Sequence, residues 1–185
     1  MRFALGMRFA KESSAARTPP DGDRLNRDSS PEAWWFRPPE EETMKCSELM
    51  TKDVECCAAG SLVEAVAEQM RAKNIGFVPV CDEKGAVIGT LTDRDLTIRV
   101  LAEHRSPGST RAKDVMTADA VVCKADDDLS VVEQLMSKHK KSRIVCVDDS
   151  SRPIGVISLA DVAQRETAGK AAAILRSVSQ REARS

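Results

Sequence analysis

The chain contains an internal repeat in which matching residues lie 66 positions apart. No gap is needed between the matched pairs, which are Met50 and Met116, Thr51 and Thr117, Asp53 and Asp119, Cys57 and Cys123, Val66 and Val132, Met70 and Met136, Asp82 and Asp148, Gly89 and Gly155, and Asp95 and Asp161. Two copies of one structural unit of about 55 residues are the simplest explanation. A unit of this size buries little core alone, so we expect the copies to pack together.

Both copies predict the same order of elements. In the first copy, Ser61 and Glu64 have the spacing of a capping box, apolar residues follow at helical spacing, and Gly76 is expected to end the helix. The remaining expected elements are a short first strand near 54–57, a buried strand at 77–81, a turn at 82–85, a strand at 86–92 and a second helix after it. The second copy repeats this order, with its first strand near 121–123. The predicted fold class is α/β (α+β), with two β-α-β-β-α repeats.

These elements divide the chain into five expected segments. They are a disordered arm at 1–43, the first repeat at 44–105, a linker at 106–111, the second repeat at 112–166 and a C-terminal helix and tail at 167–185. The arm is rich in Pro, Ser and charged residues and has no periodicity. Its Trp34-Trp35 pair is either a docking motif or part of a dispensable extension, and Met44 is an alternative translation start.

Composition excludes several functional classes. The 185 residues include 28 Lys and Arg against 29 Asp and Glu, so the net charge of −1 gives no footprint for nucleic acid or an anionic membrane. No apolar run approaches the roughly 20 residues of a membrane helix, and we expect a cytoplasmic protein. Because only 3% of residues are aromatic, aliphatic side chains must fill the core.

Each copy carries the pattern Gly-x-x-(Thr/Ser)-x-x-Asp at the end of its last strand, as GTLTDRD at 89–95 and GVISLAD at 155–161. The structural interpretation is a helix cap with an acidic residue three positions later. The functional interpretation is a ligand site in which the hydroxyl and free N–H groups hold a phosphate and the carboxylate binds ribose hydroxyls. In that interpretation, Gly89 and Gly155 leave room for the ligand. Two boxes at equivalent positions favour the functional interpretation.

The repeat of MT-x-D, an amphipathic helix, a short apolar strand, a turn and G-x-x-(T/S)-x-x-D resembles a tandem pair of cystathionine-β-synthase (CBS) domains, or Bateman module. The resemblance covers about residues 44–166 and is closest to stand-alone bacterial CBS-pair proteins. It implies two sheets packed with pseudo-twofold symmetry and two clefts that bind adenosyl ligands such as AMP, ADP, ATP, S-adenosylmethionine or NAD. It also implies a homodimer and a regulated protein partner of unknown identity.

The resemblance assigns roles to individual residues. Asp95 and Asp161 are expected to bind ribose, and Thr92 and Ser158 to contact phosphate or the ribose edge. The expected adenine pockets comprise Val54, Cys56, Phe77, Val78, Pro79 and Val80 on one side, and Val121, Val122, Arg143, Ile144 and Val145 on the other. Further phosphate candidates are Arg94, Lys140 and Arg143, although Lys140 and Arg143 also fit a solvated helix end. The second copy reads RIVC where the first reads FVPV. Because of this difference, two alternatives stay open: a ligand binds in one cleft only, or in both.

The six cysteines form no CxxC pair and have no histidine at zinc-finger spacing. Cys56 and Cys81 fall on strands expected to be parallel neighbours, within disulfide reach. They form a redox-sensitive or soft-metal pair, or they pack as small apolar residues. We predict no other metal site.

No nucleophile–base arrangement, HExxH, P-loop or GxGxxG pattern is present, which favours a non-enzymatic function. The predicted function is a regulatory nucleotide sensor that signals to a partner by conformational change. The alternative is a redox- or metal-responsive interaction module that uses Cys56 and Cys81 without nucleotide. Regulation through DNA is disfavoured by the charge.

Overall fold

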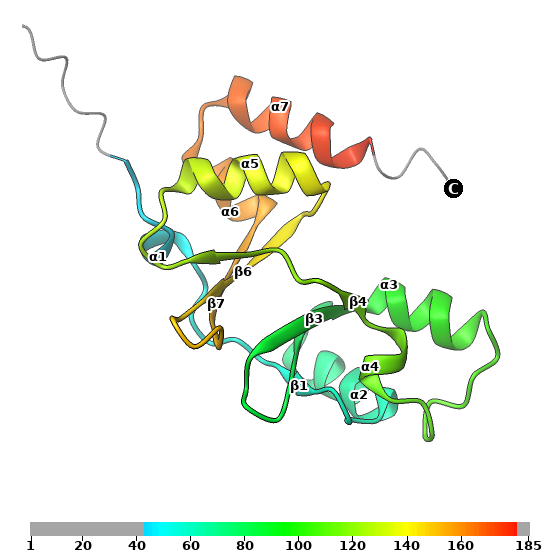
Figure 1. Ribbon diagram of the computed structural model, residues 1–185. Coiled ribbons are helices and arrows are strands. Elements are labelled where there is room, and N and C mark those ends of the chain that lie inside the picture. The colour runs from blue at the N-terminus through cyan, green and yellow to red at the C-terminus, as the bar shows by residue number, and fades with distance from the viewer. Residues whose placement is uncertain (1–42, 181–185) are drawn as a thin grey trace, which may run out of the picture. The chain divides into compact units, whose positions relative to one another are not determined.

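The computed structural model describes residues 43–180, which lie in one compact unit (Figure 1). Residues 1–42 and 181–185 lie outside the described residues. The predictions of a disordered arm and of a role for Trp34-Trp35 fall there and stay predictions.

The described chain alternates short helices and strands. The first half contains α1 (Cys46–Leu49), β1 (Cys57–Ala58), α2 (Val63–Lys73), β2 (Phe77–Cys81), β3 (Val87–Thr92), α3 (Asp93–Leu96) and a π-helical turn η1 (Thr97–Leu101). The second half contains α4 (Ala112–Val115), β4 (Thr117–Ala118), β5 (Val122–Lys124), α5 (Leu129–His139), β6 (Arg143–Val147), β7 (Pro153–Ser158), α6 (Leu159–Arg165) and α7 (Ala168–Ser179). This mixed α/β architecture confirms the predicted fold class.

The strands form two sheets with the same internal pattern. In the first sheet, β1 lies parallel to β2, and β2 is antiparallel to β3. In the second sheet, β5 lies parallel to β6, and β6 is antiparallel to β7. The helices α2 and α5 make the crossover between the parallel strands of their sheets, as a parallel pair requires. The sequence prediction placed four of these strands correctly: β2, β3, β6 and β7.

Two details of the first crossover helix differ from the prediction. Leu62, not Ser61, occupies the cap position, and no side chain caps this helix. The reason is that Leu62 forms a β-bridge with Arg111, which keeps its backbone extended. At the other end, Asn74 rather than Gly76 ends the helix, with a left-handed backbone (φ 52°) that donates its N–H to the last turn.

The two copies exchange their leading segments. Cys46 of α1 belongs to the core cluster otherwise built by the second copy, and Ala112 and Val115 of α4 belong to the core of the first. Likewise, Thr51 forms a β-bridge with Val156 of β7, and β4 pairs with β3. Each core is thus completed by the segment that begins the other copy.

This exchange explains the repeated glycines. A Cβ atom on Gly89 would lie 2.7 Å from Met116 Sδ and from the Thr117 carbonyl oxygen, and a Cβ atom on Gly155 would overlap Met50. The expectation that Gly89 and Gly155 make room for a ligand is therefore wrong. They make room for the leading segment of the other copy, which crosses at this point.

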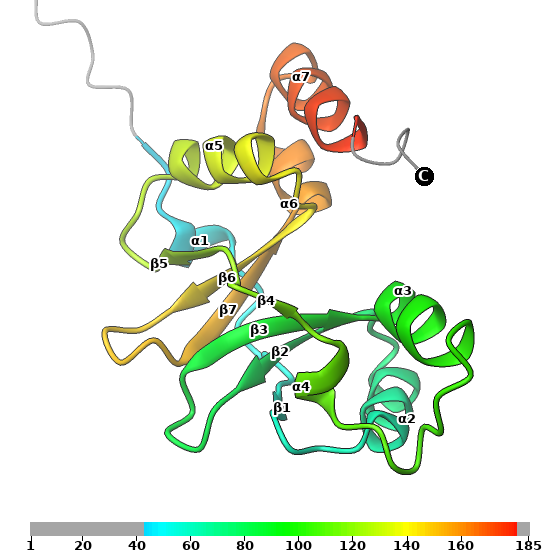
Figure 2. The same cartoon turned by 45° about the vertical axis from the view of Figure 1, so that its right-hand side comes forward.

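The predicted C-terminal helix is present as α7, despite Gly169. Figures 1 and 2 show α5, α6 and α7 gathered on one side of the sheet β5-β6-β7. Ile174 of α7 is buried in the second core. The helix also makes a polar contact with α5, where Lys140 Nζ donates to Ser177 Oγ at 2.8 Å.

Candidate functional site

Two clefts open between residues of the two copies. One, which we call the Asp95 cleft, has a volume of about 590 Å³ and contains Thr92 and Asp95. The other, the Asp161 cleft, has a volume of about 330 Å³ and contains Ser158 and Asp161. Both volumes fall in the range of small-molecule sites.

The hydroxyl–carboxylate boxes have nearly identical geometry in the two clefts. In the Asp95 cleft, Thr92 donates from its backbone N and from Oγ1 to Asp95 Oδ2, at 2.9 and 2.7 Å, and Asp95 N donates back to Oγ1 at 3.1 Å. In the Asp161 cleft, the corresponding bonds between Ser158 and Asp161 are 2.8, 2.6 and 3.2 Å. The boxes therefore cap α3 and α6, and each cap uses only one oxygen of its carboxylate.

The second carboxylate oxygen distinguishes the clefts. Asp95 Oδ1 lies 3.4 Å from Arg99 Nη2. Arg99 is held in place because it also donates to the Val115 carbonyl oxygen at 2.7 Å and to Thr117 Oγ1 at 3.3 Å. Among residues 43–180, no cation forms an ion pair with Asp161.

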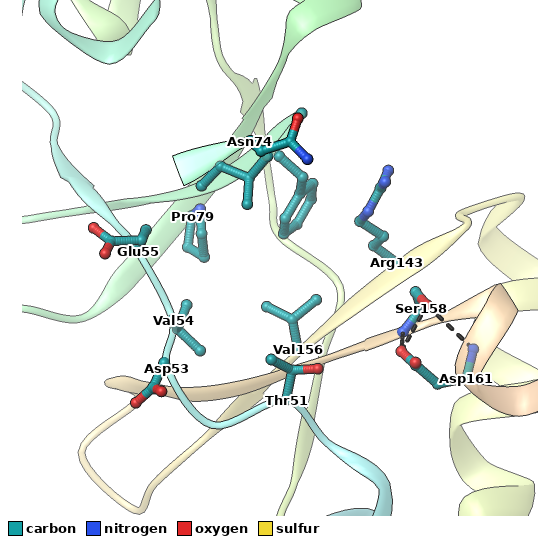
Figure 3. Close-up of a pocket in the computed structure, with 13 residues that line it drawn as sticks. Thr51, Asp53, Val54, Glu55, Asn74, Pro79, Arg143, Val156, Ser158 and Asp161 are labelled. Carbon is teal, nitrogen blue, oxygen red and sulfur yellow. Dashed lines mark hydrogen bonds between the residues drawn. The ribbon is translucent and has the colours of Figure 1, made fainter. Parts of the chain in front are cut away.

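The Asp161 cleft is bordered by an apolar strip from the first copy. Figure 3 shows Val54 and Pro79 on one side, Val156 facing them, and the box of Ser158 and Asp161 beyond. Two further carboxylates, Asp53 and Glu55, lie on the outer side of this strip. Glu55 is paired with Lys73 at 2.6 Å, and the hydrogen bond from Lys73 lowers the pKa of the Glu55 carboxyl.

The Asp95 cleft has a more basic lining. It contains four cationic side chains, and its apolar edge includes Val121 of the second copy. The cationic residues are Arg94, Arg99, Lys141 and Arg143. Two exposed carboxylates, Asp93 and Asp119, lie at the same cleft.

Phe77 and Arg143 line both clefts. They occupy equivalent positions of the repeat, 66 residues apart, and the Arg143 guanidinium carbon lies 5.8 Å from the centre of the Phe77 ring. This distance is typical of a cation–π contact. The pair therefore forms a shared boundary between the two clefts.

The structure brings together many of the predicted site residues, but in crossed combinations. Each cleft takes its hydroxyl–carboxylate box from one copy and its apolar edge from the other. The predicted residues that line a cleft are Thr92, Arg94, Asp95, Val54, Phe77, Pro79, Val121, Arg143, Ser158 and Asp161. The sequence predicted both sets without indicating which box faces which edge.

Other predicted residues lie elsewhere. The side chains of Val78, Val80, Ile144 and Val145 are fully buried and line neither cleft. For Val78, Val80 and Ile144 the reason is strand alternation, which turns them toward the helices of their own core. Cys56 and Val122 are exposed outside the clefts. Lys140 also lies outside them: it ends α5 with a left-handed backbone (φ 54°), and its Nζ donates to Ser177 Oγ of α7.

The sequence prediction missed several lining residues. Thr51 and Asp53 line the Asp161 cleft, and their repeat counterparts Thr117 and Asp119 line the Asp95 cleft. The signal was available, because all four belong to the matched pairs of the repeat. Arg99 also has an identical repeat counterpart, Arg165, but this match does not reveal its role, which depends on Asp95 four residues earlier and on a carbonyl from α4.

The cysteines gather in two groups. Cys123 Sγ lies 3.3 Å from Cys146 Sγ, and a hydrogen bond from Cys46 to Cys123 contributes to a raised pKa of the Cys46 thiol. In the other group, burial raises the pKa of the Cys81 thiol to about 12, and a hydrogen-bonding contact with Cys56 adds to the shift. The predicted proximity of Cys56 and Cys81 is therefore present, and both are free thiols.

Two features are absent from residues 43–180. No helix there is long and apolar enough to cross a membrane. In the same residues, no group of three or more His, Cys, Asp or Glu side chains is arranged to hold a metal ion.

The sequence profile of the CBS domain matches residues 46–102 and 112–167, one match for each copy. The chain belongs to the CBS-domain family. The uncharacterized protein YlbB of Bacillus subtilis is 34% identical to this CBS-domain protein over 123 residues, which cover 66% of this chain and 82% of YlbB.

Solved structures share the fold of this CBS-domain protein. The crystal structure of Hypoxic Response Protein I with two coordinated zinc ions matches with a TM-score of 0.61 and 27% identity, covering 67% of this chain and all of that one. The CBS domain pair of MJ0100, in complex with 5′-methylthioadenosine and S-adenosyl-L-methionine, matches with a TM-score of 0.59 and 22% identity, covering 66% of this chain and 95% of that one.

Proposed function

We propose that this CBS-domain protein is a cytoplasmic, non-enzymatic sensor that binds an adenosyl ligand in one or both clefts. The candidate ligands are AMP, ADP, ATP, S-adenosylmethionine and NAD. Ligand binding changes the relative population of two conformations, and a regulated partner protein distinguishes between them. A homodimer is the proposed form of the sensor.

One observation carries this proposal. A hydroxyl and a carboxylate that cap a helix in each copy also open into a cleft whose opposite edge is apolar and comes from the other copy. The carboxylate oxygen that the cap does not use, which in Asp95 is also approached by Arg99, can accept hydrogen bonds from the hydroxyls of a ribose, and the apolar edge fits a flat base. A ligand that touches both edges therefore links the copies, which is how binding is expected to alter their arrangement. The adenosyl ligands bound to the MJ0100 pair support this proposal.

Calorimetry and thermal shift with AMP, ATP, S-adenosylmethionine and NAD test the proposal. We expect at least one ligand to bind the reduced, ligand-free protein and to raise its melting temperature. The double variant Asp95→Ala plus Asp161→Ala is expected to lose this binding. Asp95→Asn plus Asp161→Asn serves as the matched variant, because Asn keeps an acceptor for the capping N–H groups but loses the charge. No binding by any of the four ligands would refute the sensor.

A second candidate function rests on the contact between Cys56 and Cys81. Cys56 is exposed and Cys81 is buried, so an oxidant can reach the pair from one side only. In this alternative, a two-electron oxidant such as a disulfide reagent converts the two thiols to one disulfide and itself takes up the two electrons and two protons. The buried Cys81 thiol, with a pKa raised to about 12, opposes this reaction because the thiolate is the nucleophile.

Thiol titration separates the two candidates. If the cysteines only pack, a thiol reagent is expected to label Cys56 in the native protein and all six cysteines after unfolding. Cys56→Ser should remove the native reaction. If mild oxidation instead protects both Cys56 and Cys81 from labelling after unfolding, while Cys57 remains reactive, the redox alternative gains support.

A further inference from the structure

The capping boxes of the two clefts have nearly the same geometry, but the charged residues that line the clefts differ. Four cationic side chains line the Asp95 cleft, whereas Arg143 is the one cationic residue among those that line the Asp161 cleft. Figure 3 shows the Arg143 side chain extending away from the box of Ser158 and Asp161. Each cleft has three carboxylates, which are Asp53, Glu55 and Asp161 here, with Glu55 paired to Lys73, and Asp93, Asp95 and Asp119 in the Asp95 cleft, so the cations make the difference.

The pairing of the ribose carboxylates increases this difference. Arg99 forms an ion pair with Asp95 and is itself fixed by two further hydrogen bonds. None of the described cations forms an ion pair with Asp161. In the second copy, the residue equivalent to Arg99 is Arg165, which is exposed and lines neither cleft.

The size of the clefts agrees with their charge. The cationic Asp95 cleft has about 590 Å³ and the anionic Asp161 cleft about 330 Å³. A phosphate group needs both additional space and charge-assisted hydrogen bonds, which arginine supplies well. An uncharged nucleoside needs neither.

We propose that the two clefts select different classes of adenosyl ligand. The Asp95 cleft takes ligands with a phosphate on the 5′ carbon, and the Asp161 cleft takes ligands whose 5′ substituent is uncharged or cationic. This inference rests on the proposed function, since it assigns ligand classes to the same clefts. It makes the protein a sensor of two chemically distinct adenosyl pools rather than of one.

Arg94 is the selective residue that can be changed most safely. Its side chain is exposed in the Asp95 cleft, and it takes no part in the capping box of Thr92 and Asp95. Loss of its charge removes one partner for phosphate without touching the Asp161 cleft.

A crossed calorimetric experiment on the full chain tests the assignment, with AMP and 5′-methylthioadenosine as probes. In Asp161→Asn, where only the Asp95 cleft keeps its carboxylate, AMP is expected to bind at least about tenfold more tightly than 5′-methylthioadenosine, the size of one charge-assisted hydrogen bond. In Asp95→Asn, the preference is expected to reverse. Raising the salt concentration should weaken AMP binding and leave 5′-methylthioadenosine binding nearly unchanged.

If circular dichroism shows that an Asn variant does not fold, the single variant Arg94→Gln replaces it as the test of the ligand assignment. We expect this substitution to weaken AMP binding by about tenfold and to leave 5′-methylthioadenosine binding as it was. The assignment is overturned if both probes show the same preference in the two Asn variants, or if Arg94→Gln affects both probes equally. In either case the proposed function survives, because ligands still bind; absence of binding by any adenosyl ligand refutes both.

Discussion

Gly155 and Gly169 are two glycines whose replacement by alanine is expected to have opposite effects. A methyl group on Gly155 would overlap Met50, so Gly155→Ala should destabilise the protein by about 1–3 kcal/mol, as overpacking does. Gly169 lies in α7 with open space around it, so Gly169→Ala should stabilise by about 0.5–1 kcal/mol through helix propensity. Urea unfolding of both variants measures the two changes.

A destabilised Gly169→Ala or an unchanged Gly155→Ala would contradict this account. The second result in particular would mean that the leading segment of the first copy does not cross β7 as closely as the structure shows.

At the scale of elements, the contact between α5 and α7 includes a buried carboxylate. Glu133 of α5 is 6% exposed and lies 2.8 Å from Lys170 of α7, and its Oε1 atom has no hydrogen-bond partner within residues 43–180. Burial raises the pKa of the Glu133 carboxyl, and the nearby charge of Glu166 adds to the shift, although Lys170 opposes it. The ionised form of Glu133 is therefore disfavoured in the folded protein.

This shift predicts a pH dependence of stability. Because the folded pKa lies above the unfolded value of 4.5, the folded state binds this proton more tightly, and its contribution to stability is lost as the pH rises through the folded pKa. We expect Glu133→Gln, which cannot ionise, to gain stability relative to the original chain as the pH rises from the unfolded pKa of 4.5 through the higher folded pKa. Urea unfolding across this range measures the difference.

The variant Glu133→Ala provides the comparison, since alanine is the residue at the equivalent position 67 of the first copy. It should show the same trend with pH. A stability difference that does not change with pH in either variant would show that the carboxyl titrates alike in the folded and unfolded chains.

Periodicity and turn residues were enough to predict most of the elements. The strands β2, β3, β6 and β7 have continuous apolar runs next to turn residues, α5 has an apolar stripe and α7 has a partial one. Predictions failed where a distant segment decides local structure. Ser61 has the right sequence for a cap, but the bridge between Leu62 and Arg111 holds this stretch extended.

At the scale of the whole molecule, the exchanged leading segments make a prediction about where each copy draws its stability. Leu49 and Val115 are repeat counterparts, yet Leu49 packs on the core of the second copy and Val115 on that of the first. We expect Val115→Ala to reduce hydrogen-exchange protection mainly in α2 and β2, and Leu49→Ala to reduce it mainly in α5 and β6.

Hydrogen exchange followed by mass spectrometry measures this crossed pattern, and the two variants control for each other. If each variant weakened only the copy to which it belongs in sequence, the exchange of leading segments would be wrong. A uniform loss of protection in both variants would show instead that the two cores open as one.

The same crossing limits what sequence alone reveals about the clefts. The two copies are alike enough that either box, Thr92 with Asp95 or Ser158 with Asp161, matches either apolar edge. The correct combination depends on contacts between residues far apart in the chain, such as the bridge between Thr51 and Val156. The charge difference between the clefts was hidden for the same reason, since Lys141 of the second copy lines the cleft that contains the Thr92 and Asp95 box of the first.

The exchanged segments also set an order of events during translation. The first core spans Cys57 to Met116, so it is complete soon after β4 leaves the ribosome. The second core joins Cys46 of α1 to Ile174 of α7. Helix α1 is therefore synthesised well before the rest of its core and stays without it until α7 has been synthesised. During that interval, its apolar residues are open to chaperones and to neighbouring nascent chains.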